Sequence, residues 1–202
     1  MLQENPGDKR IWLYLGHQNF AANLWMDAAQ WYLKFGADEG AIAVERYQAL
    51  CYCSKTFREM KDKQAIDVAI MAMALYPNYR DAYLELAHSH LLFGDNDKAI
   101  HYAKMSEVKE LITDPPHIIF INPLEYTFNK YCLYAEAYTK KDELQTALDY
   151  LMQAYQVRPV PELKRNIEGL QGNILRNRVA ESLKILAVQL LNNKELIKLA
   201  TL

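Results

Sequence analysis

Apolar and polar positions along this chain repeat in an order that predicts pairs of short helices. Four alanines, each near the start of a similar helical segment, recur at Ala28, Ala65, Ala99 and Ala147. Aspartates lie at or close to the start of the same segments, at Asp27, Asp62, Asp95 and Asp142. A short side-chain acceptor can bond the free amides of a helix start, so we expect these aspartates to mark helix N-termini. The pattern predicts helices near residues 9–22, 25–36, 41–57, 62–75, 79–93, 96–109, 124–140 and 143–156.

The spacing of the alanines indicates a known repeat. The first two intervals are 37 and 34 residues, and the third is 48. Residues 12–16 read W-x-x-L-G and residues 83–87 read Y-x-x-L-A, while Pro77 and Pro159 close the second and fourth segments. This pattern resembles the tetratricopeptide repeat (TPR), whose period is about 34 residues. The resemblance implies an all-α, right-handed solenoid of antiparallel helix pairs with extra C-terminal helices.

The sequence divides into a repeat domain over residues 1–159 and a C-terminal part over 160–202. The repeat domain is predicted to hold four TPR-like helix pairs, at 9–40, 41–77, 78–109 and 124–159. Residues 110–123 form a proline-bounded insert, and its apolar run predicts an ordered, packed loop over 114–123. The C-terminal part is predicted to cap or link the repeats with helices at Pro161 to about Leu175, at 179–191 and from about 193 to the end.

Four stretches carry a more specific resemblance. They are residues 10–18 (RIWLYLGHQ), 28–34 (AAQWYLK), 44–48 (VERYQ) and 116–126 (PHIIFINPLEY). Together they resemble the repeat region that follows the catalytic domain in certain bacterial and phage family-two glycosyltransferases. The resemblance implies a region that binds acceptor protein or mediates self-association. Strands and helices do not alternate here, so we expect no nucleotide-sugar-binding domain within the chain, and residues 2–9 resemble an inter-domain lead-in.

Composition narrows the classes of partner. The net charge of −2 argues against nucleic acid, because binding phosphate requires a clustered positive face. No apolar run reaches the roughly 18 residues that span a bilayer, and the N-terminus lacks the pattern of a signal peptide, so no membrane partner is expected. Three cysteines, an odd number without framework spacing, predict reduced thiols and a cytoplasmic protein.

The candidate chemical motifs each have a structural explanation. Residues 95–97 read D-N-D, the short pattern with which many glycosyltransferases hold a metal and a nucleotide diphosphate, but they lie where a repeat places a turn and a helix cap. Cys51 and Cys53 point about 200° apart on a helix and cannot share a metal, and the same holds for His88 and His90. We therefore expect no catalytic residue, no cofactor and no metal site, and a chain that is not an enzyme by itself.

The predicted binding surface is a groove. In TPR proteins the first helix of each pair lines the concave side, and the matching positions here are Arg10, Leu13, His17, Phe20, Tyr47, Leu50, Ser54, Phe57, Asp81, Leu84, His88 and Leu91. They form an apolar strip flanked by polar side chains, which suits a peptide with apolar anchors. An alternative interpretation is that Leu13, Leu50 and Leu84 pack against neighbouring helices. The carboxylate clamp of chaperone-binding repeats is absent from the corresponding positions.

Two functions remain open from the sequence. The first is a non-catalytic protein-interaction module that takes a protein or peptide in the concave groove, as the acceptor-recognition or self-association part of a glycosyltransferase system. The second is a structural or assembly subunit, for example of a phage or secretion machine, that packs against like copies. A nucleotide-sugar-binding domain encoded upstream in the same reading frame would distinguish the first from the second.

Overall fold

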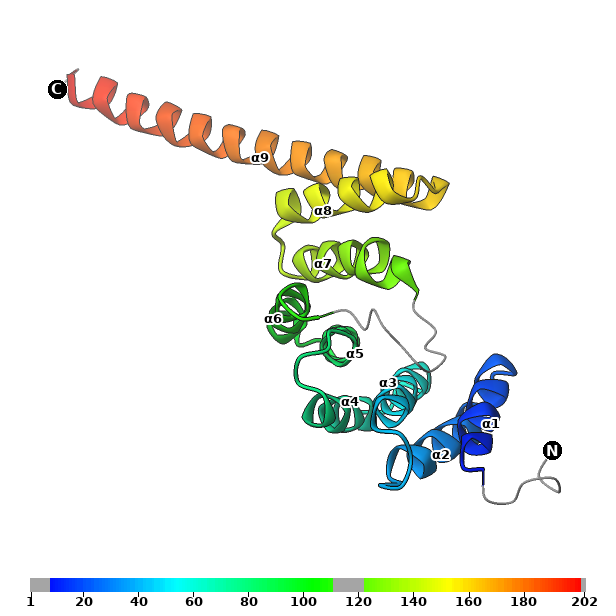
Figure 1. The fold of residues 1–202 in the computed structure, drawn as a ribbon. Helices are drawn as coiled ribbons and strands as arrows, with labels where there is room; N and C mark the ends of the chain where they lie inside the picture. The colour runs from blue at the N-terminus through cyan, green and yellow to red at the C-terminus, as the bar shows by residue number, and fades with distance from the viewer. Residues whose placement is uncertain (1–7, 111–121, 201–202) are drawn as a thin grey trace.

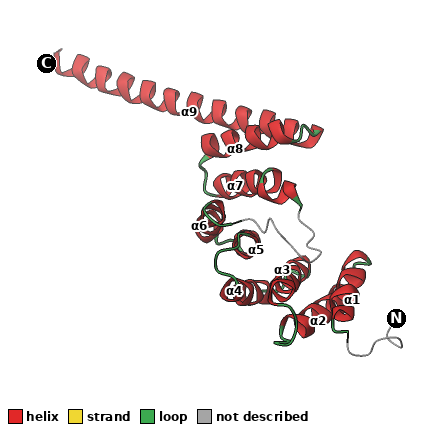
Figure 2. Ribbon diagram, in the orientation of Figure 1, coloured by secondary structure: helices red, strands yellow, loops and turns green. Residues whose placement is uncertain are grey.

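The structure is a computed structural model that describes residues 8–110 and 122–200, with side chains described as far as residue 192. The chain forms an arc of helices (Figures 1 and 2). The first part contains α1 (Arg10–Ala21), α2 (Trp25–Gly36), α3 (Ala43–Glu59), α4 (Gln64–Leu75), α5 (Asp81–Leu92) and α6 (Asn96–Glu107). The second part contains the 3₁₀ turn η1 (Pro123–Tyr126), α7 (Phe128–Lys140), α8 (Leu144–Val157) and α9 (Pro161–Ala200).

Each helix packs on the next one along the chain, from α1 through α9. Additional contacts join α3 to α5 and α5 to α7. In Figure 1, α1, α3, α5 and α7 lie on the inner side of the arc, and α2, α4, α6 and α8 lie on its outer side. The first helix of each pair therefore faces the concave side. Apart from one isolated bridge between Tyr79 and Glu110, the described ranges show no β-structure.

Small residues allow these helices to approach closely. Ala28, Ala65 and Ala99 are fully buried. A Cβ placed on Gly16 would lie 2.5 Å from Cε1 of Tyr32, whose side chain is itself completely buried between α1 and α2. The small residues of the repeat pattern thus mark the contacts where one helix leaves no room for a larger side chain on its neighbour.

The turn inside each helix pair contains one residue in the left-handed conformation. These residues are Asn23, Lys61, Gly94 and Asp142, with φ between 55° and 84°. Such a residue ends the first helix and reverses the chain. At the start of α6 the backbone amide of Lys98 donates to Asp95 Oδ1 at 3.1 Å, so Asp95 is the predicted cap. Asp142, by contrast, is a turn residue two positions before α8 rather than its cap.

The helix bounds up to α8 differ from the predicted ones by at most two residues, except at α7. A helix was expected from about residue 124, whereas η1 and Thr127 precede α7. Thr127 has φ −128° and ψ −86°, which no α-helix can include. The expected loop over 114–123 and the lead-in over 2–9 lie largely outside the described residues.

The expectation of two or three separate helices after Pro159 is wrong. One continuous helix, α9, runs for 40 residues from Pro161 to Ala200. The apolar residues change face near Leu175, which interrupts the helical periodicity of the sequence. A change of face leaves the backbone hydrogen bonds intact, and no proline after Pro161 interrupts them.

The close approach at Gly16 gives a test with a matched control. Gly16→Ala should lower the melting temperature by several degrees, because overpacking against the buried Tyr32 ring costs about 1–3 kcal/mol. Gly169→Ala, in α9 with open space around its Cα, should instead raise stability by about 0.5–1 kcal/mol through helix propensity. Thermal unfolding followed by circular dichroism measures both. An unchanged melting temperature for Gly16→Ala would contradict the α1–α2 packing.

Candidate functional site

The predicted groove residues separate into two groups in the structure. Seven are buried in the core, namely Leu13, Tyr47, Leu50, Ser54, Phe57, Leu84 and Leu91. Leu13, Leu50 and Leu84 therefore lie in the core, as the alternative interpretation of these three positions states. Five are partly exposed, namely Arg10, His17, Phe20, Asp81 and His88. These five remain the candidates for contact with a partner.

An aromatic patch, formed by His17, Phe20 and Tyr52, joins α1 to α3. The ring of His17 lies 4.8 Å from that of Tyr52, and the ring of Phe20 lies 6.0 Å from it, both edge to face. His17 Nδ1 is 2.8 Å from the hydroxyl oxygen of Tyr32, which holds the imidazole in place. Burial lowers the pKa of His17, so its ring is neutral at physiological pH. The patch therefore offers partly exposed rings without a charge.

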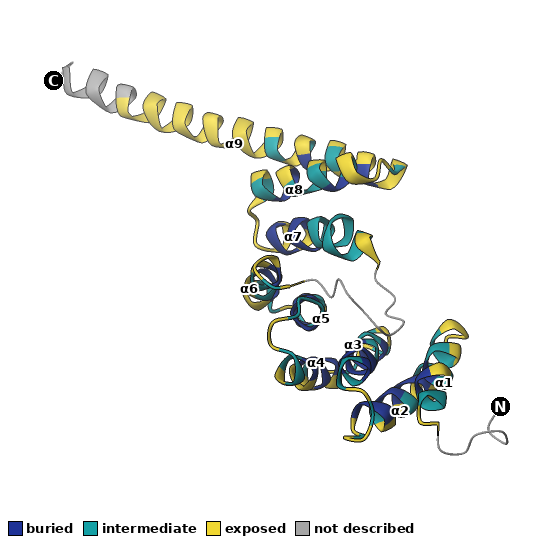
Figure 3. Cartoon of the chain, viewed as in Figure 1, coloured by how far each residue is buried: buried dark blue, intermediate teal, exposed yellow. Residues whose placement is uncertain are grey.

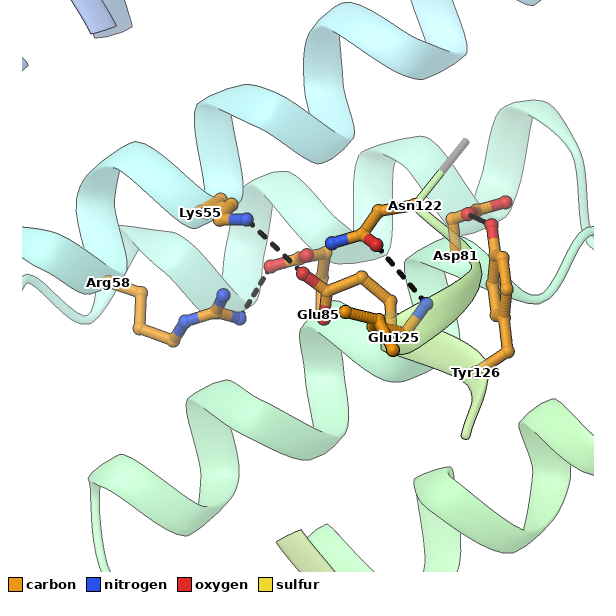
Figure 4. A network of polar contacts seen from close by, with 8 residues as sticks. Lys55, Arg58, Asp81, Glu85, Asn122, Glu125 and Tyr126 are labelled. Carbon is orange, nitrogen blue, oxygen red and sulfur yellow. Dashed lines mark hydrogen bonds and ion pairs between the residues drawn. The ribbon is translucent and has the colours of Figure 1, made fainter. Parts of the chain in front are cut away.

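A polar network joins α3, α5 and η1 (Figure 4). Arg58 of α3 pairs with Glu85 of α5, with Nη1 and Oε2 2.5 Å apart and both side chains about 15% exposed. Lys55 Nζ of α3 lies 3.4 Å from Glu125 Oε1 of η1. The network thus bridges two inner helices and η1, a segment that begins 31 residues after the end of α5 and 64 residues after the end of α3.

Both described ends of the insert attach to the start of α5. At one end the backbone amide of Glu110 donates to the Asn78 carbonyl at 2.8 Å, and the amide of Arg80 donates to the Glu110 carbonyl at 3.1 Å. At the other end the Tyr126 hydroxyl donates to Asp81 Oδ1. The guanidinium of Arg80 also lies 5.4 Å from the Tyr126 ring. These contacts hold η1 over the inner helices, with its first turn capped by the side chain of Asn122.

Buried charges set the electrostatics of this region. Burial raises the pKa of Glu85, and the positive charges of Arg58 and Lys55 oppose that rise. Burial likewise raises the pKa of Asp81, against the hydrogen bond from Tyr126. Removing Arg58 would leave the Glu85 carboxylate without its buried counter-charge, which is strongly destabilising.

His88 lies next to this network on α5. Burial lowers the pKa of His88 to about 3, and the charges of Arg58 and Lys55 act in the same direction. Its Nε2, like Asp81 Oδ2, is buried without a hydrogen-bond partner among the residues that the structure describes. A buried polar atom without a partner is unfavourable, so these two atoms are places where a bound group would gain a hydrogen bond.

The sequence analysis missed Tyr52, Lys55, Arg58, Glu85 and Tyr126. It followed fixed repeat positions on the first helices, and these five lie between those positions or in η1, directly after the insert. Arg58 lies four residues after the predicted groove position Ser54, and Lys55 lies three residues before Arg58 on the same helix face, which is the signal that could have found them.

The remaining motifs behave as ordinary structure. Asp97 of the D-N-D motif pairs with Lys141 at 2.7 Å, while Asp95 caps α6. Cys51 and Cys53 are free and buried, and burial raises the pKa of the Cys53 thiol to about 12. Within the described ranges, no three His, Cys, Asp or Glu side chains are grouped so that they could hold a metal ion. None of the helices described here combines the length and apolar character that crossing a bilayer requires.

Comparison with known proteins supports the fold. No family model matches the chain, and no curated protein matches it. It is similar in structure to a thermophilic TPR protein of Thermus thermophilus, with 20% identity, 84% of each chain covered and a TM-score of 0.60. It is also similar to the MamA protein, with 15% identity, 87% of this chain and 88% of that chain covered, and a TM-score of 0.60. The chain therefore has the all-α solenoid fold of TPR proteins.

The depressed pKa of His88 predicts a pH effect. The folded-state pKa of His88 lies below the unfolded value of 6.5. As pH falls below 6.5, the unfolded chain therefore takes up a proton that the folded chain does not, and the free energy of unfolding decreases. Between pH 7.5 and pH 5 the loss should be about 2 kcal/mol. His88→Gln should remove it, whereas His101→Gln, an exposed histidine on α6, should not.

The measurement is the melting temperature of both variants and the wild type across this pH range. The quantity compared is the slope of melting temperature against pH. Carboxyl groups whose pKa is raised by burial, such as Glu85, stabilise the fold as pH falls in all three proteins, so only the difference between slopes reports on His88. Parallel curves for His88→Gln and the wild type would contradict the buried, neutral imidazole.

Proposed function

We propose that this chain is a non-catalytic protein-interaction module that binds a peptide segment on its concave side, along α1, α3 and α5. The TPR fold supports a binding role only as an analogy, because one fold serves many functions. The observation on which the proposal rests is the position of η1 against α3 and α5. The four residues of η1, directly after the insert, lie against α3 and α5, where Glu125 pairs with Lys55 and Tyr126 donates a hydrogen bond to Asp81. The inner helices thus already hold a short peptide segment by its side chains.

The aromatic patch supplies the second part of the proposed site. His17, Phe20 and Tyr52 are partly exposed and lie on the same inner helices, α1 and α3. Rings held by their neighbours lose little conformational entropy when a ligand binds, and such residues dominate binding energy at interfaces. We expect an apolar or aromatic anchor of the partner to contact this patch. A neutral His17 favours such an anchor over a charged one.

The resemblance of four sequence stretches to family-two glycosyltransferases supports a finer proposal. On that basis the module is the acceptor-recognition or self-association part of a glycosyltransferase system in a bacterium or phage. The alternative is an assembly subunit that packs against like copies. Two buried free thiols, Cys51 and Cys53, fit a reducing, cytoplasmic compartment. A nucleotide-sugar-binding domain in the same reading frame would support the first of these roles.

Peptide selection tests the binding site directly. A library of random peptides displayed on phage is selected against the full chain, and the best binder is titrated by calorimetry. Phe20→Ala combined with Tyr52→Ala should weaken its binding by about 1–4 kcal/mol, as expected for the loss of two anchors. The matched control is Ile70→Ala with Met71→Ala, two exposed apolar residues on the outer helix α4, and it should leave the affinity unchanged.

Circular dichroism of each variant separates binding from folding, because Tyr52 also stacks on the buried Tyr32. Phe20→Ala alone gives a milder change with the same expected direction. Selection of peptides whose affinity depends on Ile70 and Met71 instead would move the site to the convex side and contradict the proposal.

A further inference from the structure

The C-terminal helix leaves the solenoid about one third of the way along its length (Figures 1 and 3). Leu163 and Leu170 are buried, and Ile167 and Ile174 pack on the same core cluster beside α8. From residue 175 to residue 192 every side chain is exposed. At 1.5 Å per residue, the helix after Ile174 extends about 39 Å beyond the solenoid.

The free part of this helix carries an apolar stripe. Its members are Leu175, Val179, Leu183, Leu186 and Leu190, each between 51% and 63% exposed. At 100° per residue the five lie within an arc of about 80°, and their spacing of four or three residues is that of a helix–helix seam. The stripe therefore has the form of one half of a helix–helix contact.

Little else stabilises this part of the helix. The ion pair between Lys184 and Glu181 spans 3.7 Å, and both side chains are at least 66% exposed. Such a pair contributes little to the stability of the helix. Burial of the stripe would supply the missing stabilisation, since tertiary packing of one face is the main source of helix stability in proteins.

We propose that the stripe packs against the same stripe of a second copy of this chain, with the two helices antiparallel. This inference concerns α9 alone and does not depend on the groove. The stripe is close to self-complementary when its direction is reversed. In that register Leu175 lies opposite Leu190 of the partner and Val179 lies opposite Leu186, while Leu183 lies next to its own copy.

Charge and size favour the antiparallel orientation. Arg176 flanks the stripe. In a parallel pair the two copies of Arg176 would lie at the same height along the helices, whereas the antiparallel register places them about 20 Å apart along the axis and so reduces their repulsion. Ala180 and Ala187 follow one edge of the stripe and permit a close approach of the two helices.

The position of the stripe leaves room for the second copy. It lies about 150° around the helix from the residues that face α8, so a second helix would not meet the solenoid. The two solenoids would extend from opposite ends of the helix pair. A contact of five aliphatic residues on each side is at the small end of specific interfaces, so we expect a dimer that dissociates at concentrations on the order of micromolar.

Sedimentation velocity of the full chain between about 1 and 200 µM tests the pairing. The wild type should pass from monomer to dimer over this range. Leu183→Gln with Leu186→Gln should weaken the dimer at least tenfold. The matched control is Ile185→Gln with Val188→Gln, which removes two aliphatic side chains of similar exposure from another side of the same helix, and it should change the affinity much less.

Disulfide trapping tests the orientation. One preparation carries Val179→Cys and the other Leu186→Cys, both with Cys132→Ser to remove the partly exposed native thiol. On mild oxidation of the mixture, the antiparallel pair predicts that cross-linked dimers between the two preparations exceed those within either one. A parallel pair predicts the reverse, because each cysteine would then lie beside its own copy.

Three results would overturn the proposal. They are a wild type that stays monomeric throughout, an equal loss of dimer in the control, and cross-linking only within each preparation. A monomer that sediments with vesicles of phosphatidylcholine and phosphatidylglycerol through the stripe would assign it to a lipid surface instead. Because the substituted side chains are exposed in the monomer, an unchanged melting temperature should accompany each variant and shows that the solenoid is intact.

Discussion

Close packing at small residues is the constraint on which the rest of this structure depends. Gly16 lies against the buried ring of Tyr32, and Gly36 lies against the side chain of Leu50, so a larger residue at either position would clash with the neighbouring helix. Ala65 and Ala99, in the second helices of the next two pairs, are fully buried. Because each pair stacks on the next, the first helices line one side of an arc (Figure 1). The aromatic patch and the polar network exist because that side brings α1, α3 and α5 together.

The local pattern of the sequence was sufficient to predict the helix pairs, and the turns follow from it. It was less informative about which groove positions face solvent. Leu50 and Leu84 satisfy the positional rule for the concave side, yet both are buried, because the distance to the neighbouring helix decides exposure and helical periodicity does not contain that distance. The polar network was missed for a related reason. Lys55 and Glu125 are far apart in sequence, and only the path of the insert brings them together.

The insert and the C-terminal helix distinguish this chain from a plain array of repeats. The insert ends at η1 on the inner helices, where Tyr126 and Glu125 contact Asp81 and Lys55. The C-terminal helix begins as one more layer of the solenoid and then continues alone. The two proposed surfaces lie on separate elements, the concave side on α1, α3 and α5 and the apolar stripe on the free part of α9. Binding of a peptide by one and pairing of two copies by the other are therefore compatible, and each can fail without the other.

The central claim is that the concave side is the binding surface. A crystal structure of the full chain with a selected peptide tests it most directly. The account predicts density for the peptide along α1 and α3, with an apolar or aromatic side chain against Phe20 and Tyr52. Density confined to the outer helices α2 and α4 would contradict it.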